Sequence, residues 1–273
     1  MELAGTTTLL VALKAEAQPL IDYYKLKSIQ QRPFPIFSNG QLKVIVTGVG
    51  AYRSATALGY ANASSAAPTS HIWINFGIAG HRNHPVGTAV SVSKVINNNN
   101  QSSWYPNLIK LPNTLIEPLT THDQIIKDYT NDTLCDMEGA GFMSAASSLH
   151  IKSECLFVFK IISDNQHSKV ERITKNLVTK LINTHISTLE TLIKKAEEVV
   201  QDARNFVTDI DSELLKTWHF SQSQKNQLNE NMRRFKALDK QSSWPDINLD
   251  ECVTAKGVIE KLNRRLLQML PKF

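Results

Sequence analysis

The stretch Lys160 to Gln166, with the sequence KIISDNQ, places an aspartate directly after an apolar run that opens at Leu156. The run has the character of a buried strand, and Asp164 stands close to its expected carboxyl end. A carboxyl group there can cap a following helix, because its oxygens accept unpaired backbone N–H groups. It can also do proton chemistry, since α/β sheets place reactive side chains just outside the carboxyl ends of their strands. These seven residues alone favour the cap.

Three further acids stand at comparable points of the chain. Glu16 follows the first expected strand in the stretch ALKAE, residues 12–16, and Asp136 and Glu138 flank Met137 at the beginning of an expected helix. Glu16 could be a solvated helix residue. Asp136 and Glu138 could simply stabilise a helix N-terminus through the helix dipole. Each of these acids could therefore have a purely structural role instead of a catalytic one.

Two glycine-rich stretches also follow expected strands. They are TGVG at residues 47–50 and NFGIAG at residues 75–80. A glycine-rich turn after a strand allows the backbone to approach a ligand closely. The same residues could equally form ordinary turns, for which glycine is well suited.

The elements that must position these residues alternate between strands and helices. Strands are predicted at residues 8–13, 42–46, 72–76, 88–96 and 156–162, and helices at residues 15–24, 54–63, 138–149 and 169–203. Strands alternating with helices predict a largely parallel sheet with both faces covered. The acids and glycines above each stand at the end of an expected strand, where α/β sheets place their chemistry.

The character of the chain changes after about residue 206. Strand signals are absent from there on, and amphipathic helices are predicted at residues 212–220, 222–238 and 249–270. The last of these carries a stripe formed by Ala255, Ile259, Leu262 and Leu266. We therefore expect an α/β domain over residues 1–205 and a helical C-terminal extension over residues 206–273.

Composition narrows the classes of function. The net charge is +5, from 30 basic and 25 acidic residues spread along the 273-residue chain, so neither nucleic acid nor a membrane surface is expected as a partner. The three cysteines lie far apart without metal-ligand spacing, which predicts reduced thiols and a cytoplasmic protein. The first residues lack the pattern of a signal peptide, and no apolar run reaches the length of a membrane span.

Taken together and in this order, the motifs resemble those of the nucleoside phosphorylase and nucleosidase superfamily. The likeness is strongest to the methylthioadenosine/S-adenosylhomocysteine nucleosidases and related nucleoside hydrolases. Residues 12–16, 47–50, 75–80 and 136–138, with the Ile-Ser-Asp stretch at residues 162–164, match five motifs of that family. The resemblance covers about residues 8–200. It implies a three-layer α/β/α fold with a mixed sheet, to which residues 206–273 add a helical appendage.

The resemblance also implies an activity, cleavage of the bond between ribose and a purine base, most closely adenine. Asp164 matches the acid that protonates the departing base, and Glu16 matches the residue that activates the attacking water. Glu138 would bind the ribose hydroxyls, with Met137 packed against the sugar and Asp136 beside it. The remaining expected contacts of the base and water pocket are Ser163, Gly50, Gly77, Ile78 and Ile126. Neither a cofactor nor a metal is implied.

Two alternatives stay open. Phosphorylases of the superfamily hold phosphate with arginines, and Arg53 and Arg82 lie near the glycine-rich stretches, so a phosphate-dependent enzyme is the first. The second is a non-catalytic nucleoside-binding module that works through the helical extension. An acid at Glu16 would repel phosphate and favours hydrolysis. Residues 94–135 are shorter than in the family, which favours a more open pocket and a larger 5′ substituent, and family members commonly form homodimers.

Overall fold

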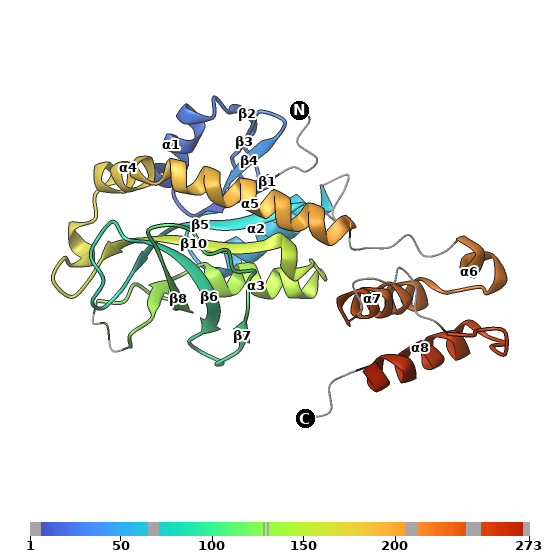
Figure 1. Ribbon diagram of the computed structural model, residues 1–273. Helices are drawn as coiled ribbons and strands as arrows, with labels where there is room; N and C mark the ends of the chain where they lie inside the picture. Colours follow the sequence, from blue (N-terminus) through green and yellow to red (C-terminus); the bar gives the residue numbers. More distant parts are fainter. Residues whose placement is uncertain are drawn as a thin grey trace. The chain divides into compact units, whose positions relative to one another are not determined.

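The computed structural model describes residues 7–64, 71–127, 129, 131–205, 212–238 and 247–269 (Figure 1). The chain divides into two compact units, Met1–Val200 and Gln201–Phe273. The division falls inside helix α5 (Ile186–Asn205), close to the predicted boundary at residue 205. Among the described residues, no helix has the length and apolar character that crossing a membrane requires.

The first unit is built on a ten-stranded mixed sheet. Its strands are β1 (Thr7–Val11), β2 (Lys27–Gln30), β3 (Ile36–Ser38), β4 (Leu42–Val46), β5 (Ile72–Gly80), β6 (Ala89–Asn97), β7 (Ser103–Trp104), β8 (Thr114–Thr121), β9 (Leu134–Asp136) and β10 (Leu156–Asp164). Strand β10 pairs with β5 in parallel and with β6 in antiparallel orientation. Because β6, β8, β9 and β5 also pair in that order, five strands form a closed ring.

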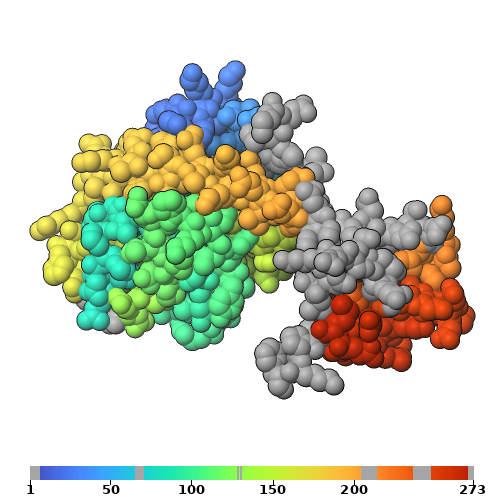
Figure 2. Space-filling model, viewed as in Figure 1, coloured from blue at the N-terminus to red at the C-terminus, as the bar shows by residue number. Residues whose placement is uncertain are grey.

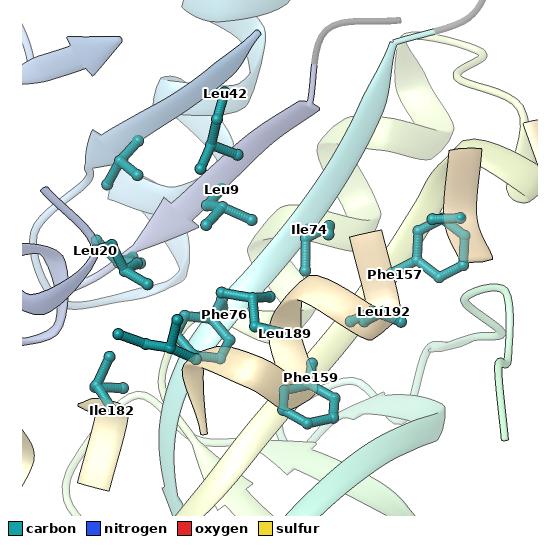
Figure 3. Packing of buried hydrophobic residues seen from close by; sticks show 14 of the residues in the cluster. Leu9, Leu20, Leu42, Ile74, Phe76, Phe157, Phe159, Ile182, Leu189 and Leu192 are labelled. Atoms are coloured by element: carbon teal, nitrogen blue, oxygen red, sulfur yellow. The ribbon is translucent and has the colours of Figure 1, made fainter. Parts of the chain in front are cut away.

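Helices cover both faces of this sheet, which confirms the predicted three-layer arrangement. They are α1 (Lys14–Tyr23), α2 (Ala51–Ala63), α3 (Gly139–Ser148), α4 (Lys175–Thr184) and α5. One face packs against α1, α4 and α5 through side chains that include Leu20, Ile74, Phe76, Ile182 and Leu189 (Figure 3). The other face packs against α2 and α3. Figure 2 shows the layer of α4 and α5 in yellow to orange. All nine residues of β10 are buried, since the strand lies between the two layers.

Two expectations about local structure were wrong. Residues 77–80 continue β5 instead of forming a turn, and their pairing with β10 extends to Gly80. Residues 169–203 do not form one helix. They form a short 3₁₀ helix (Val170–Arg172), then α4, then α5, with a break at His185, whose ring nitrogen lies 2.7 Å from the carbonyl oxygen of Gly87. This tertiary contact overrides a helical pattern that the sequence alone carries through the break.

The strands missed by the sequence analysis are β2, β3, β7, β8 and β9. Strands β2 and β3 are short and partly exposed, and β7 and β9 have only two and three residues. Strand β8 carries Pro118 and alternates weakly between apolar and polar side chains. These strands are too short or alternate too weakly for local periodicity to reveal them, although β2 and β3 are neighbours in the chain and pair with each other.

The second unit has a hydrophobic core of its own. It contains α6 (Ser212–Thr217), α7 (Gln222–Leu238) and α8 (Ala255–Met269). Its core includes Leu214, Phe220, Leu228, Phe235, Val258 and Leu262. Helix α8 begins at Ala255 rather than at residue 249 as predicted, because the Thr254 hydroxyl accepts the N–H of Gly257 at 3.2 Å and acts as its cap. Residue 270, the predicted end, lies outside the described residues.

Candidate active site

A cavity of about 370 Å³ opens in the first unit beside the carboxyl ends of β1, β5 and β10. This is the edge of the sheet at which α/β proteins place ligands. The carboxyl groups of Glu16, Asp136, Glu138 and Asp164 all line it. Acids that are separated by up to 148 residues in the chain therefore meet around one cavity.

Glu16 lies in the first turn of α1 and is only 2% exposed. Its Oε2 accepts the backbone N–H of Leu13 at 2.8 Å, and its Oε1 accepts that of Ile78 at 2.9 Å. A Cβ atom added to Gly77 would lie 2.5 Å from Oε1, so the carboxylate requires glycine there. Burial raises the pKa of Glu16, although the backbone N–H donors and Lys160 oppose that rise. A raised pKa brings a carboxylate closer to the basicity that a general base needs near neutral pH.

Glu138 immediately precedes α3 and faces the same cavity. Its Oε1 accepts the backbone N–H of Gly50 at 2.8 Å, which joins the first glycine-rich stretch to the third motif. Burial and the nearby Asp136 raise the pKa of Glu138 to about 7, against the opposing effects of Lys160 and the Gly50 N–H. Glu138 is therefore a buried group that changes charge near neutral pH.

Asp136 is engaged by three protein donors. The Nζ of Lys160 lies 2.9 Å from its Oδ2, the N–H of Gly139 donates to the same oxygen at 2.9 Å, and the Thr121 hydroxyl donates to Oδ1 at 2.7 Å. Burial lowers the pKa of Lys160, but Asp136, Glu138 and Glu16 together raise it above its ordinary value. Lys160 is thus a buried cation that balances the charge of the surrounding carboxyl groups.

Asp164 ends β10 with its side chain 3% exposed. Its Oδ1 accepts the Ser163 hydroxyl at 2.5 Å, and its Oδ2 accepts the hydroxyl of Tyr129. Residues 165–169 form a turn, and it is the Oδ1 of Asn165 that accepts the N–H groups of His167 and Ser168, at 2.9 and 2.8 Å. Asn165 therefore holds this turn, and the cap of the following helix α4 is Thr174, whose hydroxyl accepts the N–H of Leu177 at 3.2 Å. Asp164 lines the cavity instead.

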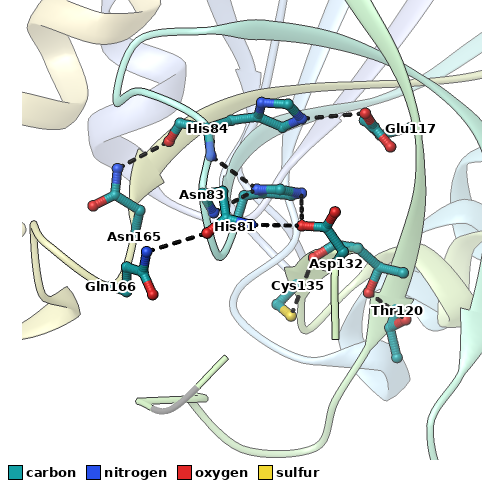
Figure 4. A network of polar contacts seen from close by, with 10 residues as sticks. His81, Asn83, His84, Glu117, Thr120, Asp132, Cys135, Asn165 and Gln166 are labelled. Carbon is teal, nitrogen blue, oxygen red and sulfur yellow. Dashed lines mark hydrogen bonds and ion pairs between the residues drawn. The ribbon is translucent and has the colours of Figure 1, made fainter. Parts of the chain in front are cut away.

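A polar network holds the carboxyl end of β10 to the turn that follows β5 (Figure 4). The Nδ1 of buried His81 accepts the N–H groups of Asn83 and His84 at 3.0 and 3.1 Å, which fixes that turn. The Nδ2 of Asn165 donates to the carbonyl of His84 at 2.9 Å, and the Nε2 of Gln166 donates to Asn83 at 3.1 Å. These bonds tie the backbone that follows Asp164 to the turn at residues 81–84 and so fix the position of Asp164.

The predicted pocket residues fall into two groups. Ser163, Ile78, Ile126 and Met137 line the cavity together with the four acids. Gly50 and Gly77 are not among its lining residues, but each supports a lining carboxylate, Gly50 through its N–H and Gly77 through the space it leaves.

The sequence analysis missed three residues of the site, Lys160, Tyr129 and Thr121. A lysine inside the apolar run LFVFKII was an available signal, because a charged residue in a buried strand requires a partner. Thr121 carried no comparable signal. Tyr129 lies in a polar segment, and nothing in its neighbours in the sequence points to Asp164.

Comparison with solved structures gives the fold a name. The structure is similar to the 5′-methylthioadenosine/S-adenosylhomocysteine nucleosidase of Campylobacter jejuni, with a TM-score of 0.57, 16% identity, and 70% of this chain and 99% of that chain covered. The 5′-methylthioadenosine nucleosidase of Arabidopsis thaliana gives 0.52 and 19%, over 72% and 96% of the two chains. The futalosine hydrolase of Helicobacter pylori gives 0.57 and 10%, over 71% and 99%.

The chain therefore has the fold of the nucleosidases, with an additional segment beyond it. No protein-family model and no curated protein matches the sequence. The resemblance inferred from the five motifs is confirmed at the level of the fold, since nearly the whole length of each of these nucleosidases is covered.

Proposed function

We propose that the protein is an N-ribosyl hydrolase that cleaves the glycosidic bond of an adenine nucleoside carrying a 5′ substituent. The observation that carries the proposal is the convergence of Glu16, Glu138 and Asp164 on one cavity in a nucleosidase fold. In this reaction the departing base gathers electrons while the ribose becomes cationic. Asp164 protonates the base, Glu138 binds the ribose hydroxyls, and Glu16 takes a proton from the attacking water.

The distribution of cations supports hydrolysis over phosphorolysis. Phosphate recognition needs a positive charge at the site, usually from arginine. Within the described part of the chain, the residues that line the cavity include neither arginine nor lysine. Arg53 and Arg82 are exposed and are not among those residues, and Lys160 is paired with Asp136. A phosphate in this cavity would instead face the carboxyl groups of Glu16, Glu138 and Asp164.

We propose for Asp136 a different role from the ribose contact predicted for it. Since Lys160, Thr121 and Gly139 engage both of its oxygens, we propose that it positions the cation beneath the site, and that Glu138 provides the ribose contact. Val49, Tyr52 and Ile125 are exposed apolar side chains, and Val49 and Ile125 also line the cavity. They support an apolar 5′ substituent and the predicted homodimer, in which a second copy would cover them.

The proposal is tested by measuring adenine release from a panel of 5′-substituted adenosines, with and without inorganic phosphate. We expect release that is independent of phosphate and accompanied by free ribose derivatives. Release that requires phosphate and yields a ribose 1-phosphate would establish the phosphorylase alternative. If the panel gives no release under either condition, the non-catalytic binding module becomes the better description.

The variant Glu16→Gln is expected to slow hydrolysis by about 10²- to 10⁴-fold, because the attacking water loses its base. Adenine affinity, measured by calorimetry, should change little, since Glu16 serves the water rather than the purine. Glu230→Gln, which alters an exposed glutamate paired with Arg234 in the second unit, is the matched control and should hydrolyse normally. Phosphate-dependent turnover that survives in Glu16→Gln would contradict the assigned role.

A further inference from the structure

Tyr129 occupies the end of the cavity where the acid lies. Its hydroxyl donates to the Oδ2 of Asp164, and its ring is half-buried among the cavity-lining residues. The ring edge lies so close to Gly80 that a Cβ atom at that glycine would overlap the phenol oxygen. The Oδ1 of Asp164 accepts the Ser163 hydroxyl, so both oxygens of the acid already have a hydroxyl partner.

This arrangement conflicts with the role of Asp164 as an acid. A general acid must bring its proton within hydrogen-bond reach of the base. The Ser163 hydroxyl, which also lies 3.3 Å from the carbonyl oxygen of Ala79, belongs to the buried strand, so Oδ1 is turned toward the protein. Oδ2 is the oxygen that a nucleobase can reach, and Tyr129 holds it. Base and phenol cannot use that position together.

The described contacts on either side of Tyr129 are exposed, which allows its side chain to move away from Asp164. On one side, Lys127 pairs with Glu171 at 3.1 Å, and these side chains are 68% and 53% exposed. On the other side, the Oδ1 of Asp132, which is 72% exposed, accepts the Nδ2 of Asn83 at 3.1 Å and lies 3.7 Å from the Nε2 of His81 (Figure 4). Exposed contacts of this kind contribute little to stability, so these two do little to keep Tyr129 at Asp164.

We propose that Tyr129 is an internal competitor of the nucleobase and sets the affinity of the site for it. The phenol hydroxyl holds the acid until a base enters, and the base displaces it from Oδ2. The apparent affinity for the base is then the intrinsic affinity multiplied by the fraction of molecules in which Tyr129 has left Oδ2. This inference rests on the proposed function, because it takes Asp164 as the group that meets the base.

The test compares the full-length wild type with Tyr129→Phe and Tyr129→Ala. Tyr129→Phe removes only the hydroxyl, and Tyr129→Ala also removes the ring. Adenine affinity is measured by calorimetry, and KM and kcat are measured for base release. We expect roughly tenfold tighter adenine binding in Tyr129→Phe, because the hydrogen bond that competes for Oδ2 is lost, with a KM lowered by a similar factor. Tyr105→Phe, at a tyrosine 66% exposed, is the control and should match the wild type.

The double variant Tyr129→Phe/Asp164→Asn isolates the contact. If the phenol acts by holding the carboxylate, the gain in adenine affinity from Tyr129→Phe should shrink to about twofold or less in the Asp164→Asn background. An equal gain in both backgrounds would overturn the proposed mechanism, because the phenol would then act through something other than the acid.

The remaining outcomes are also decisive. Unchanged affinity in both single variants would overturn the inference while leaving the hydrolase function intact. Weaker adenine binding, or a fall in kcat at saturating substrate, would overturn it by showing that Tyr129 assists the base instead of competing with it. Adenine binding that appears only in the variants would support it strongly. If wild type and variants all fail to bind adenine and to release it, the inference and the proposed function fail together.

Discussion

Replacing Asp164 by asparagine is expected to reduce base release by at least 10²-fold and by as much as about 10⁴-fold, the usual contribution of a positioned general acid. An amide has nearly the same shape as a carboxylic acid but does not supply a proton to the departing base. The fold should survive, because the amide oxygen can still accept the Ser163 hydroxyl and the Tyr129 hydroxyl can rotate to accept from the amide nitrogen. Single-turnover base release and thermal unfolding measure the two effects separately.

The matched control for this variant is Asp123→Asn. Asp123 is exposed and accepts the Nδ2 of Asn99 at 2.6 Å, outside the set of cavity-lining residues. It should release base at the wild-type rate. Near-normal turnover in Asp164→Asn would show that this aspartate serves the structure rather than the chemistry, and the acid would have to be sought elsewhere in the cavity.

Replacing Lys160 by methionine is expected to cost about 3–5 kcal/mol of unfolding free energy at pH 8, the usual penalty for removing one partner of a buried ion pair. Lys160 and Asp136 have side chains that are 2% and 1% exposed, and Glu138 and Glu16 lie near enough to interact with the same cation. Methionine keeps much of the volume of the lysine stem. The loss should therefore report the uncompensated charge on the carboxyl groups.

The size of this loss should depend on pH. Glu138 has a pKa of about 7 in the folded protein, above the ordinary value of 4.5, so the cost of burying it is absent below pH 4.5, grows between pH 4.5 and 7, and is fully present above pH 7. Removing Lys160 raises the pKa of Glu138 further. The variant can protonate this group at pH 5.5 but less readily at pH 8. Urea unfolding should accordingly show a smaller loss at pH 5.5 than at pH 8.

Two further variants separate charge from packing. Lys127→Met, at an exposed lysine, should cost less than about 1 kcal/mol. The double variant Lys160→Met/Asp136→Asn removes both members of the buried pair and should recover part of the stability. A loss that is the same at both pH values and is not recovered in the double variant would mean that the lysine stem matters through its packing alone.

Local patterns along the chain were sufficient to predict the layered α/β architecture and the candidate acids. Apolar runs separated by helical patterns predicted a covered sheet. The ends of those elements pointed to the four acids as candidate site residues, namely Glu16, Asp136, Glu138 and Asp164. Both inferences depend on local order along the chain, which the sequence contains in full. The same local order suggested Asp164 as a helix cap, but in the structure the cap of the following helix α4 is Thr174.

The partners that distinguish the acids from one another are visible in the tertiary structure but not in the sequence. Strand β10 is buried on both faces, so its residues show no alternation from which the direction of Lys160 could be read. The pairing of Lys160 with Asp136 depends on the register of strands far apart in the chain. The contact of Tyr129 with Asp164 spans 35 residues, and the break at His185 depends on a carbonyl 98 residues away. Such contacts arise from packing between distant segments, which leaves no periodic signal in either one.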